Sequence, residues 1–371
     1  MRVAPPRYLV MTPGITGADG ISAASRLTVR ALAASSVPGT RAHVAVLSLG
    51  DPPDVGWPDS GGVDVQVAGA AGRKGRFIAM ALGTVFNRVP SRRILCLHLA
   101  LGPMAQLAAR RSRMAIFLHG IEAWRPLRRL ERFALHRADI LMANSAHTVR
   151  RFQEANPQFA NRAIHVCHLG IGYEPIVPGR APESLPGMRP GTFALIVGRM
   201  AAEERYKGHD LLIDIWPRVM AAVPGADLVV VGDGDDRARL EARAAHLGNH
   251  VSFLGRVSDG VLASLYRDCA FFGMPSRDEG FGLVFLEAMR EGKACIGGVG
   301  AAAEIIDHGV TGLIVDPNDP GQVLNAVLRL FREPETRERM GRAGAARVET
   351  RFTEAHFQQR FRQLLGLDSS V

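Results

Sequence analysis

Short apolar runs recur along the chain and alternate with longer segments whose apolar residues follow a helical period. A first series of runs spans residues 8–12, 42–48, 94–98, 115–119, 139–143 and 163–168. A second series spans residues 192–197, 227–232, 251–255, 269–275, 294–298 and 312–315. Such runs are typical of strands buried on both faces, and strands separated by helices form parallel sheets through right-handed crossovers. The pattern therefore predicts two Rossmann-like α/β domains.

A proline-rich segment separates the two series. Five prolines lie between residues 173 and 191, which is too many for a helix or a central strand. We therefore expect an N-terminal domain at residues 1–175, a linker at 176–191 and a C-terminal domain at 192–348. Residues 349–371 carry an apolar stripe at helical spacing, which predicts a C-terminal helix packed in a core and crossing back to the N-terminal domain. The two sheets should face each other across a cleft.

Length and composition agree with two packed domains. The chain has 371 residues, and 47% of them are apolar. We find no uncharged apolar run of about 18 residues and no apolar centre of a secretory signal, so we expect a cytoplasmic protein. The four cysteines are scattered through apolar segments, which argues against a disulfide framework or a zinc site.

The charge is unevenly distributed. Residues 1–185 hold 23 Lys and Arg against 11 Asp and Glu, a net charge of +12, whereas residues 186–371 have a net charge of −3. This asymmetry indicates an anionic partner for the first half, such as a membrane surface, a lipid diphosphate or nucleic acid. The basic residues are not interleaved with stacking aromatic residues, so we expect no nucleic acid. The favoured partner is an anionic membrane surface at the inner face of the plasma membrane.

One basic segment has two interpretations. Arginines alternate with apolar residues between Trp124 and Arg137, and a similar pattern begins at Arg73. An interfacial membrane helix has this composition. A Rossmann helix that packs its apolar side on the sheet also has it, and packing is favoured because every such helix needs an apolar stripe.

Two glutamates, Glu279 and Glu287, bracket a Gly-Phe-Gly turn that follows an apolar run and leads into a helical pattern. Glu279 should lie on the loop and Glu287 one turn inside the helix, so both carboxylates can face one crevice. The first N–H groups of that helix have no partner within it and form an anion site with the positive end of its dipole. The segment therefore predicts a nucleotide-sugar site. The alternative is a solvated acidic helix start.

Cations follow the first strand of the second half. Arg199 and Lys207 are the residues that we expect to bind a diphosphate, since a guanidinium and an ammonium both stabilise phosphate oxygens. The alternative is a salt-bridged surface loop with Glu203 and Glu204. The presence of Glu279 and Glu287 favours the diphosphate.

The first half offers two further candidates at the ends of predicted strands, where ligands bind in parallel sheets. A glycine-rich turn, residues 13–20, follows the first strand and could approach phosphate closely. His119 follows a buried strand and precedes a glycine, so it is expected at the mouth of the cleft. Either a structural role or a substrate contact fits a single histidine.

Several motifs occur in order between residues 192 and 317. They are Gly198-Arg199, Lys207-Gly208, Gly232-Asp233-Gly234, Phe253-Leu254-Gly255, the segment from Glu279 to Glu287 and Gly309-Val310-Thr311-Gly312-Leu313. Together they resemble glycosyltransferase family 4, and the segment from His119 to Trp124 extends the similarity into the first half. The resemblance implies the GT-B fold. It also implies a retaining hexosyltransferase that uses a nucleotide-diphosphate sugar without an essential metal or other cofactor.

The resemblance implies a role for each candidate residue. Glu279 would hold hydroxyls of the donor sugar, Glu287 the ribose diol, and Arg199 with Lys207 the diphosphate, while His119 would contact the sugar. Donor contacts would also come from backbone at Gly17, Gly20, Gly198, Arg256, Val257, Gly280, Phe281, Gly282 and Leu283. Many relatives have adjacent glycines where this chain has Gly17-Ala18-Asp19-Gly20, which leaves open the glycine that approaches the donor.

The implied reaction moves a hexose from a donor of the UDP-glucose or GDP-mannose type to a saccharide or lipid-linked saccharide, in cell-surface or exopolysaccharide biosynthesis. A departing phosphate oxygen would take the acceptor proton, so neither glutamate need be a nucleophile. A GT-B phosphorylase or a nucleotide-sugar epimerase is the alternative among enzymes. A nucleic-acid-binding protein and a catalytically silent sugar-binding subunit are alternatives from other classes.

Overall fold

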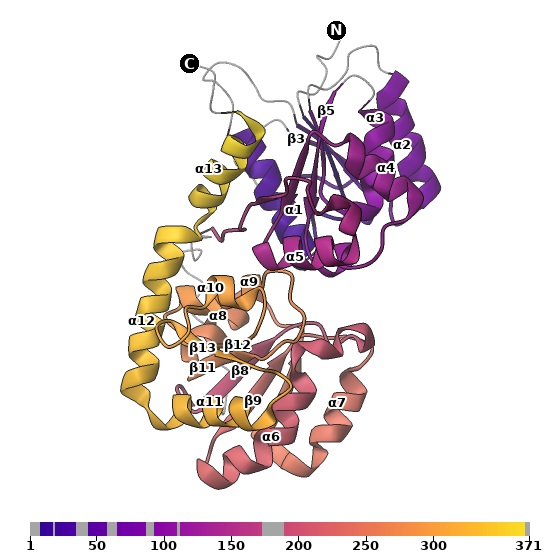
Figure 1. Cartoon of the computed structure of the whole chain (residues 1–371). Coiled ribbons are helices and arrows are strands. Elements are labelled where there is room, and N and C mark those ends of the chain that lie inside the picture. Colours follow the sequence, from indigo (N-terminus) through magenta and orange to yellow (C-terminus); the bar gives the residue numbers. More distant parts are fainter. Residues whose placement is uncertain are drawn as a thin grey trace. The chain divides into compact units, whose positions relative to one another are not determined.

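The computed structural model describes residues 8–17, 19–34, 44–57, 65–86, 93–109, 112–172 and 189–367. These residues form two compact units (Figure 1). Met1–Gly170 and Glu354–Val371 make up the first unit, and Ile171–Thr353 make up the second. The expected linker, residues 176–191, lies outside the described residues except for its last three positions.

The first unit contains a parallel sheet of seven strands in the order β3-β2-β1-β4-β5-β6-β7. Its strands are β1 Tyr8–Thr12, β2 Val44–Ser48, β3 Val65–Gly69, β4 Arg93–Cys96, β5 Arg113–Leu118, β6 Ile140–Ala143 and β7 His165–Val166. Its helices are α1 Gly20–Ala33, α2 Lys74–Phe86, α3 Gly102–Ala108, α4 Arg129–Arg137, α5 Ala146–Ala155 and α13 Glu354–Leu365. α1 packs against α13, and α3 packs between α2 and α4 on the other side of the sheet (Figure 1).

The second unit contains a parallel sheet of six strands in the order β10-β9-β8-β11-β12-β13. Its strands are β8 Phe193–Val197, β9 Asp227–Val231, β10 Val251–Gly255, β11 Phe271–Met274, β12 Cys295–Gly298 and β13 Gly312–Val315. Its helices are α6 His209–Ala222, α7 Arg237–Ala244, α8 Asp259–Asp268, α9 Leu283–Arg290, α10 Ala302–Ile305, α11 Pro320–Arg332 and α12 Pro334–Arg351. Helices α6, α7 and α11 cover one face of this sheet, and α8, α9 and α10 cover the other (Figure 1).

Both sheets are parallel throughout, so the predicted α/β fold class is confirmed. One strand lies outside every predicted run. β3 has the sequence Val-Gln-Val-Ala-Gly, is only partly buried and lies at the edge of its sheet. A search for continuous apolar runs misses such a strand because only central strands need apolar residues on both faces.

The C-terminal stripe is buried as predicted. Phe352, Phe357, Phe361 and Leu365 are at most 2% exposed, and α13 packs on α1. All four cysteines are buried and carry free thiols. Among the helices that the structure describes, none has the length and apolar character needed to cross a membrane.

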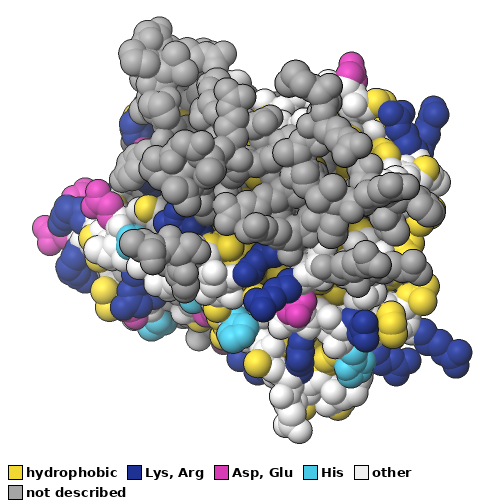
Figure 2. Space-filling model, turned by 90° about the horizontal axis from the view of Figure 1, so that it is seen from above, with side chains coloured by type: hydrophobic (Ala, Val, Ile, Leu, Met, Phe, Trp, Pro, Cys, Tyr) yellow, Lys and Arg dark blue, Asp and Glu magenta, His cyan; other side chains and the backbone are white. Residues whose placement is uncertain are grey.

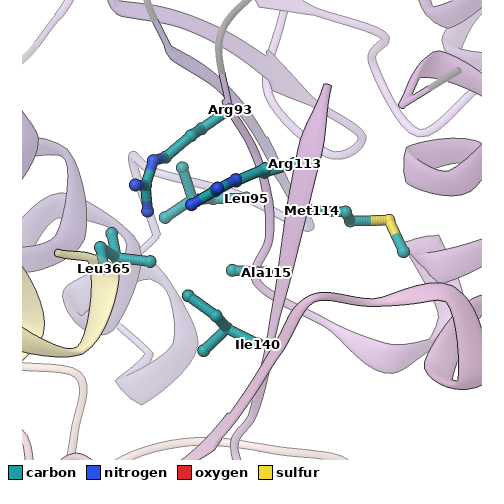
Figure 3. Close-up of a pocket in the computed structure, with 7 residues that line it drawn as sticks. All are labelled: Arg93, Leu95, Arg113, Met114, Ala115, Ile140 and Leu365. Atoms are coloured by element: carbon teal, nitrogen blue, oxygen red, sulfur yellow. The ribbon is translucent and has the colours of Figure 1, made fainter. Parts of the chain in front are cut away.

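A small cavity in the first unit lies at the amino ends of β4, β5 and β6. Its volume is about 10 Å³, roughly the space of one water molecule. Figure 3 shows Arg93 and Arg113 pointing towards Leu365 of α13, whereas Met114 points to the other side. This cavity is too small for a sugar nucleotide and lies at the sheet edge opposite the strand ends where ligands bind in such folds.

Candidate active site

Glycines bring the loops at the carboxyl edge of the second sheet into close contact. A Cβ atom at Gly232 would lie 2.0 Å from the carbonyl oxygen of Gly198, and one at Gly298 would lie 1.9 Å from that of Ser276. The backbone N–H of Arg277 donates to the carbonyl of Tyr206 at 2.9 Å, which joins these loops to each other. The loops that carry the predicted cations and the loop that carries Glu279 therefore form one packed platform.

Arg199 and Lys207 meet at a buried carboxylate on this platform. Arg199 follows β8, and Lys207 ends the short 3₁₀ segment Ala202–Lys207. Glu204 forms ion pairs with both, and its Oε2 lies 3.2 Å from the Lys207 ammonium nitrogen. The side chain of Glu204 is 9% exposed and that of Arg199 is 59% exposed. The two cations thus converge, and the salt bridge with Glu204 that the sequence analysis offered as the alternative is present as well.

A second ion-pair network holds the segment that carries Lys207. Asp236 is 4% exposed and accepts hydrogen bonds from the guanidinium groups of Arg205 and Arg239. Arg239 also donates to Asp210 in α6 at 2.6 Å. These arginine hydrogen bonds lower the pKa of Asp236, with the bond from Arg239 the largest cause. The network ties the 3₁₀ segment to α6 and α7, so Lys207 lies on a fixed backbone.

Glu279 lies beside this cation pair. Its carboxylate accepts hydrogen bonds from the backbone N–H groups of Gly280 and Phe281, and it lies in the field of Lys207 and Glu204. Burial is the largest influence and raises the pKa of Glu279 above its ordinary value, although Lys207 and the two amides oppose it. Glu279 itself therefore accepts from two of the amides that were predicted to bind the donor.

Glu287 lies one turn inside α9, as the spacing predicts. It accepts a hydrogen bond of 2.8 Å from the phenolic hydroxyl of Tyr266 in α8. Burial is the main cause of a raised pKa at Glu287, and the hydroxyl of Tyr266 opposes it. The Tyr266 hydroxyl orients the carboxylate while leaving its remaining lone pairs for another donor.

Of the other predicted contacts of the second unit, Gly198 lies against Lys207 and Gly282 lies against Glu279, whereas Arg256 and Val257 follow the edge strand β10. A Cβ atom at Gly198 would lie 3.3 Å from Lys207 Cδ. Because glycine has no side chain, the side chain of Lys207 can pack directly against the Gly198 backbone. Gly282 has φ 95° and a Cβ atom there would lie 3.4 Å from Glu279 Cγ, while Leu283 is the first residue of α9. Arg256 and Val257 directly follow β10, and Arg256 is exposed.

In the first unit, His119 is 8% exposed and follows β5. Burial, with a smaller contribution from His98, lowers the pKa of its imidazole to about 3, so the ring is neutral at pH 7. Its Nε2 is buried without a hydrogen-bond partner among the described residues. The side-chain amide of Asn144 donates to the His119 carbonyl at 2.7 Å and fixes the backbone. His119 can therefore exchange a hydrogen bond with a hydroxyl but cannot act as a cation.

Asp51 holds the glycine-rich turn. It accepts hydrogen bonds from the backbone N–H groups of Ile15 at 2.7 Å and Thr16 at 3.2 Å, and from the Ser48 hydroxyl at 2.5 Å. Burial opposes ionisation, but these hydrogen bonds outweigh it and lower the pKa of Asp51. The turn is therefore rigid and anchored from a different strand.

The two candidate glycines of this turn differ. A Cβ atom at Gly17 would lie 2.5 Å from Asp19 Oδ2, whereas one at Gly20 would have open space around it. Gly20 is the first residue of α1, and Asp19 caps that helix by accepting from the Ile21 and Ser22 amides. Ala18, between them, lies outside the described residues.

Sequence reasoning missed several groups that shape these sites. They are Glu204 as a shared counter-ion, and Asp51, His98, Tyr266 and Asp236. His98 lies two residues after β4 and carried the same signal as His119, a polar residue at the end of a buried apolar run. The sequence analysis named Glu204 as a salt-bridge partner, and the structure adds that Arg199 and Lys207 share it. Asp51, Tyr266 and Asp236 could not be found from spacing, because they bond to Ile15, Glu287 and Arg205, which lie far away in the sequence. In the part of the chain that the structure describes, no group of three His, Cys, Asp or Glu residues could hold a metal ion.

Comparison with known proteins identifies the family. The family described as Glycosyl transferases group 1 matches residues 189–347. The GDP-mannose-dependent alpha-(1-6)-phosphatidylinositol monomannoside mannosyltransferase of Mycolicibacterium smegmatis is 31% identical over 262 residues, which cover 66% of this chain and 67% of that protein. The chain belongs to the glycosyl transferases group 1 family. The predicted resemblance is thereby confirmed.

Further members of the family and solved structures agree. A GDP-mannose-dependent monoacylated alpha-(1-6)-phosphatidylinositol monomannoside mannosyltransferase of Corynebacterium glutamicum is 29% identical over 242 residues, 61% of this chain and 62% of that protein. The chain thus spans less than two thirds of the length of that curated relative. HepE of Anabaena, solved in complex with UDP and glucose, has a TM-score of 0.75 at 19% identity and covers 98% of this chain and 100% of its own. That likeness shows the fold, which is of the GT-B class.

Proposed function

We propose that this protein is a retaining hexosyltransferase that uses a nucleotide-diphosphate sugar. The observation that carries the proposal is the convergence of Arg199, Lys207 and Glu279 on one platform at the strand ends, with Glu287 one turn into the adjoining helix. Two cations can neutralise a diphosphate and two carboxylates can accept sugar hydroxyls. This combination fits a ligand that contains both a diphosphate and a sugar, as a nucleotide-diphosphate sugar does.

In this mechanism Arg199 and Lys207 stabilise the negative charge that develops on the leaving diphosphate as the glycosidic bond breaks. Glu279 orients the sugar through its hydroxyls. A leaving phosphate oxygen takes the proton of the acceptor hydroxyl, which attacks from the face of departure, so the anomeric configuration is retained. No residue is required as a nucleophile, and no metal is required for charge neutralisation.

We infer a lipid-linked or other saccharide as the acceptor, in cell-surface polysaccharide or glycolipid synthesis at the inner face of the membrane. The names of the relatives from Corynebacterium glutamicum and Mycolicibacterium smegmatis support this proposal. Both names specify a phosphatidylinositol monomannoside and GDP-mannose. GDP-mannose is therefore the first donor to test, and UDP-glucose is the second.

A panel of UDP and GDP sugars in a thermal-shift assay tests donor binding. A ligand at about 100 times its dissociation constant stabilises the folded state by about 2.7 kcal/mol, which such an assay detects readily. Release of free nucleotide with and without saccharide acceptors then separates transfer from epimerisation, which releases none. A phosphorylase would instead require inorganic phosphate or a sugar phosphate.

Two variants test the cation roles. Arg199→Ala and Lys207→Ala should each lower turnover by about 10²- to 10³-fold, the usual effect of removing one preorganised charge donor. Glu203→Gln, an exposed neighbour in the same segment, is the matched control and should keep its turnover. Wild-type turnover in either alanine variant would contradict the proposed function.

A further inference from the structure

Helix α4 presents a surface that the interior of the first unit does not use. Only Glu131, Ala134 and Leu135 of this helix are buried. The exposed residues of α4 are Arg129, Leu130, Arg132, Phe133, His136 and Arg137. This exposed face, called here the α4 face, contains only basic, histidine and apolar side chains.

The apolar residues of the α4 face are unusually accessible. Leu130 is 68% exposed and Phe133 is 56% exposed, and they lie three residues apart on the same side of the helix. The expectation that this apolar stripe packs on the sheet is therefore wrong for Leu130 and Phe133. Trp124 and Leu127, which precede the helix, do pack against the core. Ala134 and Leu135 pack the helix against the core, whereas Leu130 and Phe133 remain exposed.

The α4 face has no acidic group to offset its arginines. The only carboxylate of the helix belongs to Glu131, which is buried and accepts two hydrogen bonds from the guanidinium of Arg125 at 2.7 and 2.9 Å. Arg129, Arg132 and Arg137 therefore face solvent as uncompensated charges of the helix. A face with these properties is complementary to a surface that is both anionic and apolar beneath its charged layer.

The start of α2 has the same character. Arg73, Lys74 and Arg76 are exposed there, and Ile78 in the next turn is 42% exposed. α3 packs between α2 and α4, so both basic segments belong to the same layer of helices (Figure 1). In the view from above in Figure 2, dark blue basic side chains lie beside yellow apolar ones on the part of the surface that the structure describes.

We propose that the α4 face docks the first unit on an anionic lipid bilayer, with Leu130 and Phe133 inserted among the acyl chains and the arginines against lipid phosphates. The inference rests on the proposed function for its biological purpose, which is access to a lipid-linked acceptor. Charge alone would also suit nucleic acid, but a phosphate backbone gives no reason for an exposed Leu130. The exposed Leu130 and Phe133 therefore favour a lipid bilayer over a nucleic acid as the partner.

Co-sedimentation of the full chain with vesicles tests this proposal. We expect binding to phosphatidylcholine vesicles that contain phosphatidylglycerol and much weaker binding to phosphatidylcholine alone. Arg129→Gln combined with Arg132→Gln should lower the partition coefficient about 30-fold, since each cation near an anionic leaflet contributes about a factor of five. Leu130→Ala combined with Phe133→Ala should lower it on the order of 10-fold through lost apolar insertion.

Matched controls come from the second unit. Arg339→Gln combined with Arg342→Gln removes the same charge at the same spacing from α12, and Val310→Ala removes an exposed apolar side chain. Both controls should bind vesicles like the wild type. Thermal shifts with GDP and UDP sugars should be unchanged in every variant, so a failure of docking is distinguishable from a failure of the proposed function.

Three outcomes would overturn the proposal. If the variant with Leu130→Ala and Phe133→Ala binds vesicles as well as the wild type, the binding depends on charge alone and not on insertion of the apolar pair. Equal losses in the α12 control would show that net charge, and not the α4 face, governs binding. A change of oligomeric state in the Leu130 and Phe133 variant, with vesicle binding intact, would assign the face to a second copy of the chain.

Discussion

Glu204→Gln is the substitution that best tests how the cation pair is built. The carboxylate of Glu204 is nearly buried and pairs with both Arg199 and Lys207. Glutamine keeps the shape and the hydrogen-bonding carbonyl but removes the charge. We expect this variant to lower the stability of the free protein and to raise its affinity for a nucleoside diphosphate.

The stability change follows from the exposure of the two pairs. The Arg199 side chain is 59% exposed, so solvent screens its pair with Glu204 and that pair contributes little. The Lys207 side chain is 17% exposed and lies 3.2 Å from Glu204, where the Coulomb energy is roughly 5 kcal/mol at an effective dielectric constant of about 20. Desolvation offsets much of that attraction, so we expect a net loss of about 1 to 3 kcal/mol in the free energy of unfolding.

The affinity change has the opposite sign. A phosphate oxygen and a Glu204 oxygen that share one ammonium group would be about 5 Å apart, and their repulsion is worth roughly 1 to 3 kcal/mol at effective dielectric constants between about 80 and 20. Removing the carboxylate charge should therefore tighten binding of GDP or UDP by about 5- to 150-fold. Isothermal titration measures the affinity, and urea denaturation measures the stability.

Glu203→Gln is the control, because it removes the same charge from an exposed neighbouring position. It should change the affinity less than threefold, on the scale of a screened surface charge. Weaker nucleotide binding by Glu204→Gln would refute the reasoning, since Glu204 would then position Lys207 for the phosphate and would not compete with it.

Three further outcomes are expected. Glu279→Gln should abolish transfer and stabilise the free protein more at about pH 8 than at about pH 5 in urea titrations, because a raised carboxyl pKa means that ionisation opposes folding as the pH rises. Asp51→Asn should destabilise the protein by about 1 to 3 kcal/mol at neutral pH, with a smaller deficit once the pH falls below its ordinary pKa of 3.8, since a lowered pKa contributes stability only to the ionised form. Gly232→Ala should lower the free energy of unfolding by about 2 to 4 kcal/mol, because its Cβ atom would meet the Gly198 carbonyl at 2.0 Å; a melting temperature equal to that of the wild type would exclude the close contact.

The fold class could be predicted because central strands of parallel sheets must be apolar on both faces. The runs at residues 8–12, 227–232 and 251–255 each contain or match an observed strand. Edge strands escape this argument, and β3 was missed for that reason. The sequence pattern also could not predict which side of α4 is exposed, because Leu130 and Phe133 have helical spacing whether they face the sheet or the solvent.

The positions of the site residues were predictable because strand ends and turns are local features. Glu287 falls one turn into α9, and Arg199 follows β8, as their spacing requires. Their partners were not predictable. Tyr266 reaches Glu287 from α8 across 21 positions, and Asp51 reaches the first turn across 35 positions. Such pairs depend on strand order in the folded sheet, which no local pattern encodes.

The carboxylates of the candidate site pair with its own cations and amides. Glu204 occupies the two cations, and Glu279 occupies the amides of Gly280 and Phe281. Two cations and two amides without partners would be costly in a partly buried platform, so these carboxylates stabilise the folded protein. In the proposed function, the diphosphate must take over the cations from Glu204, and the sugar must draw Glu279 from the amides onto its hydroxyls. Donor binding is then an exchange of anions, so a nucleoside without phosphates would release neither carboxylate and should bind far more weakly than its diphosphate.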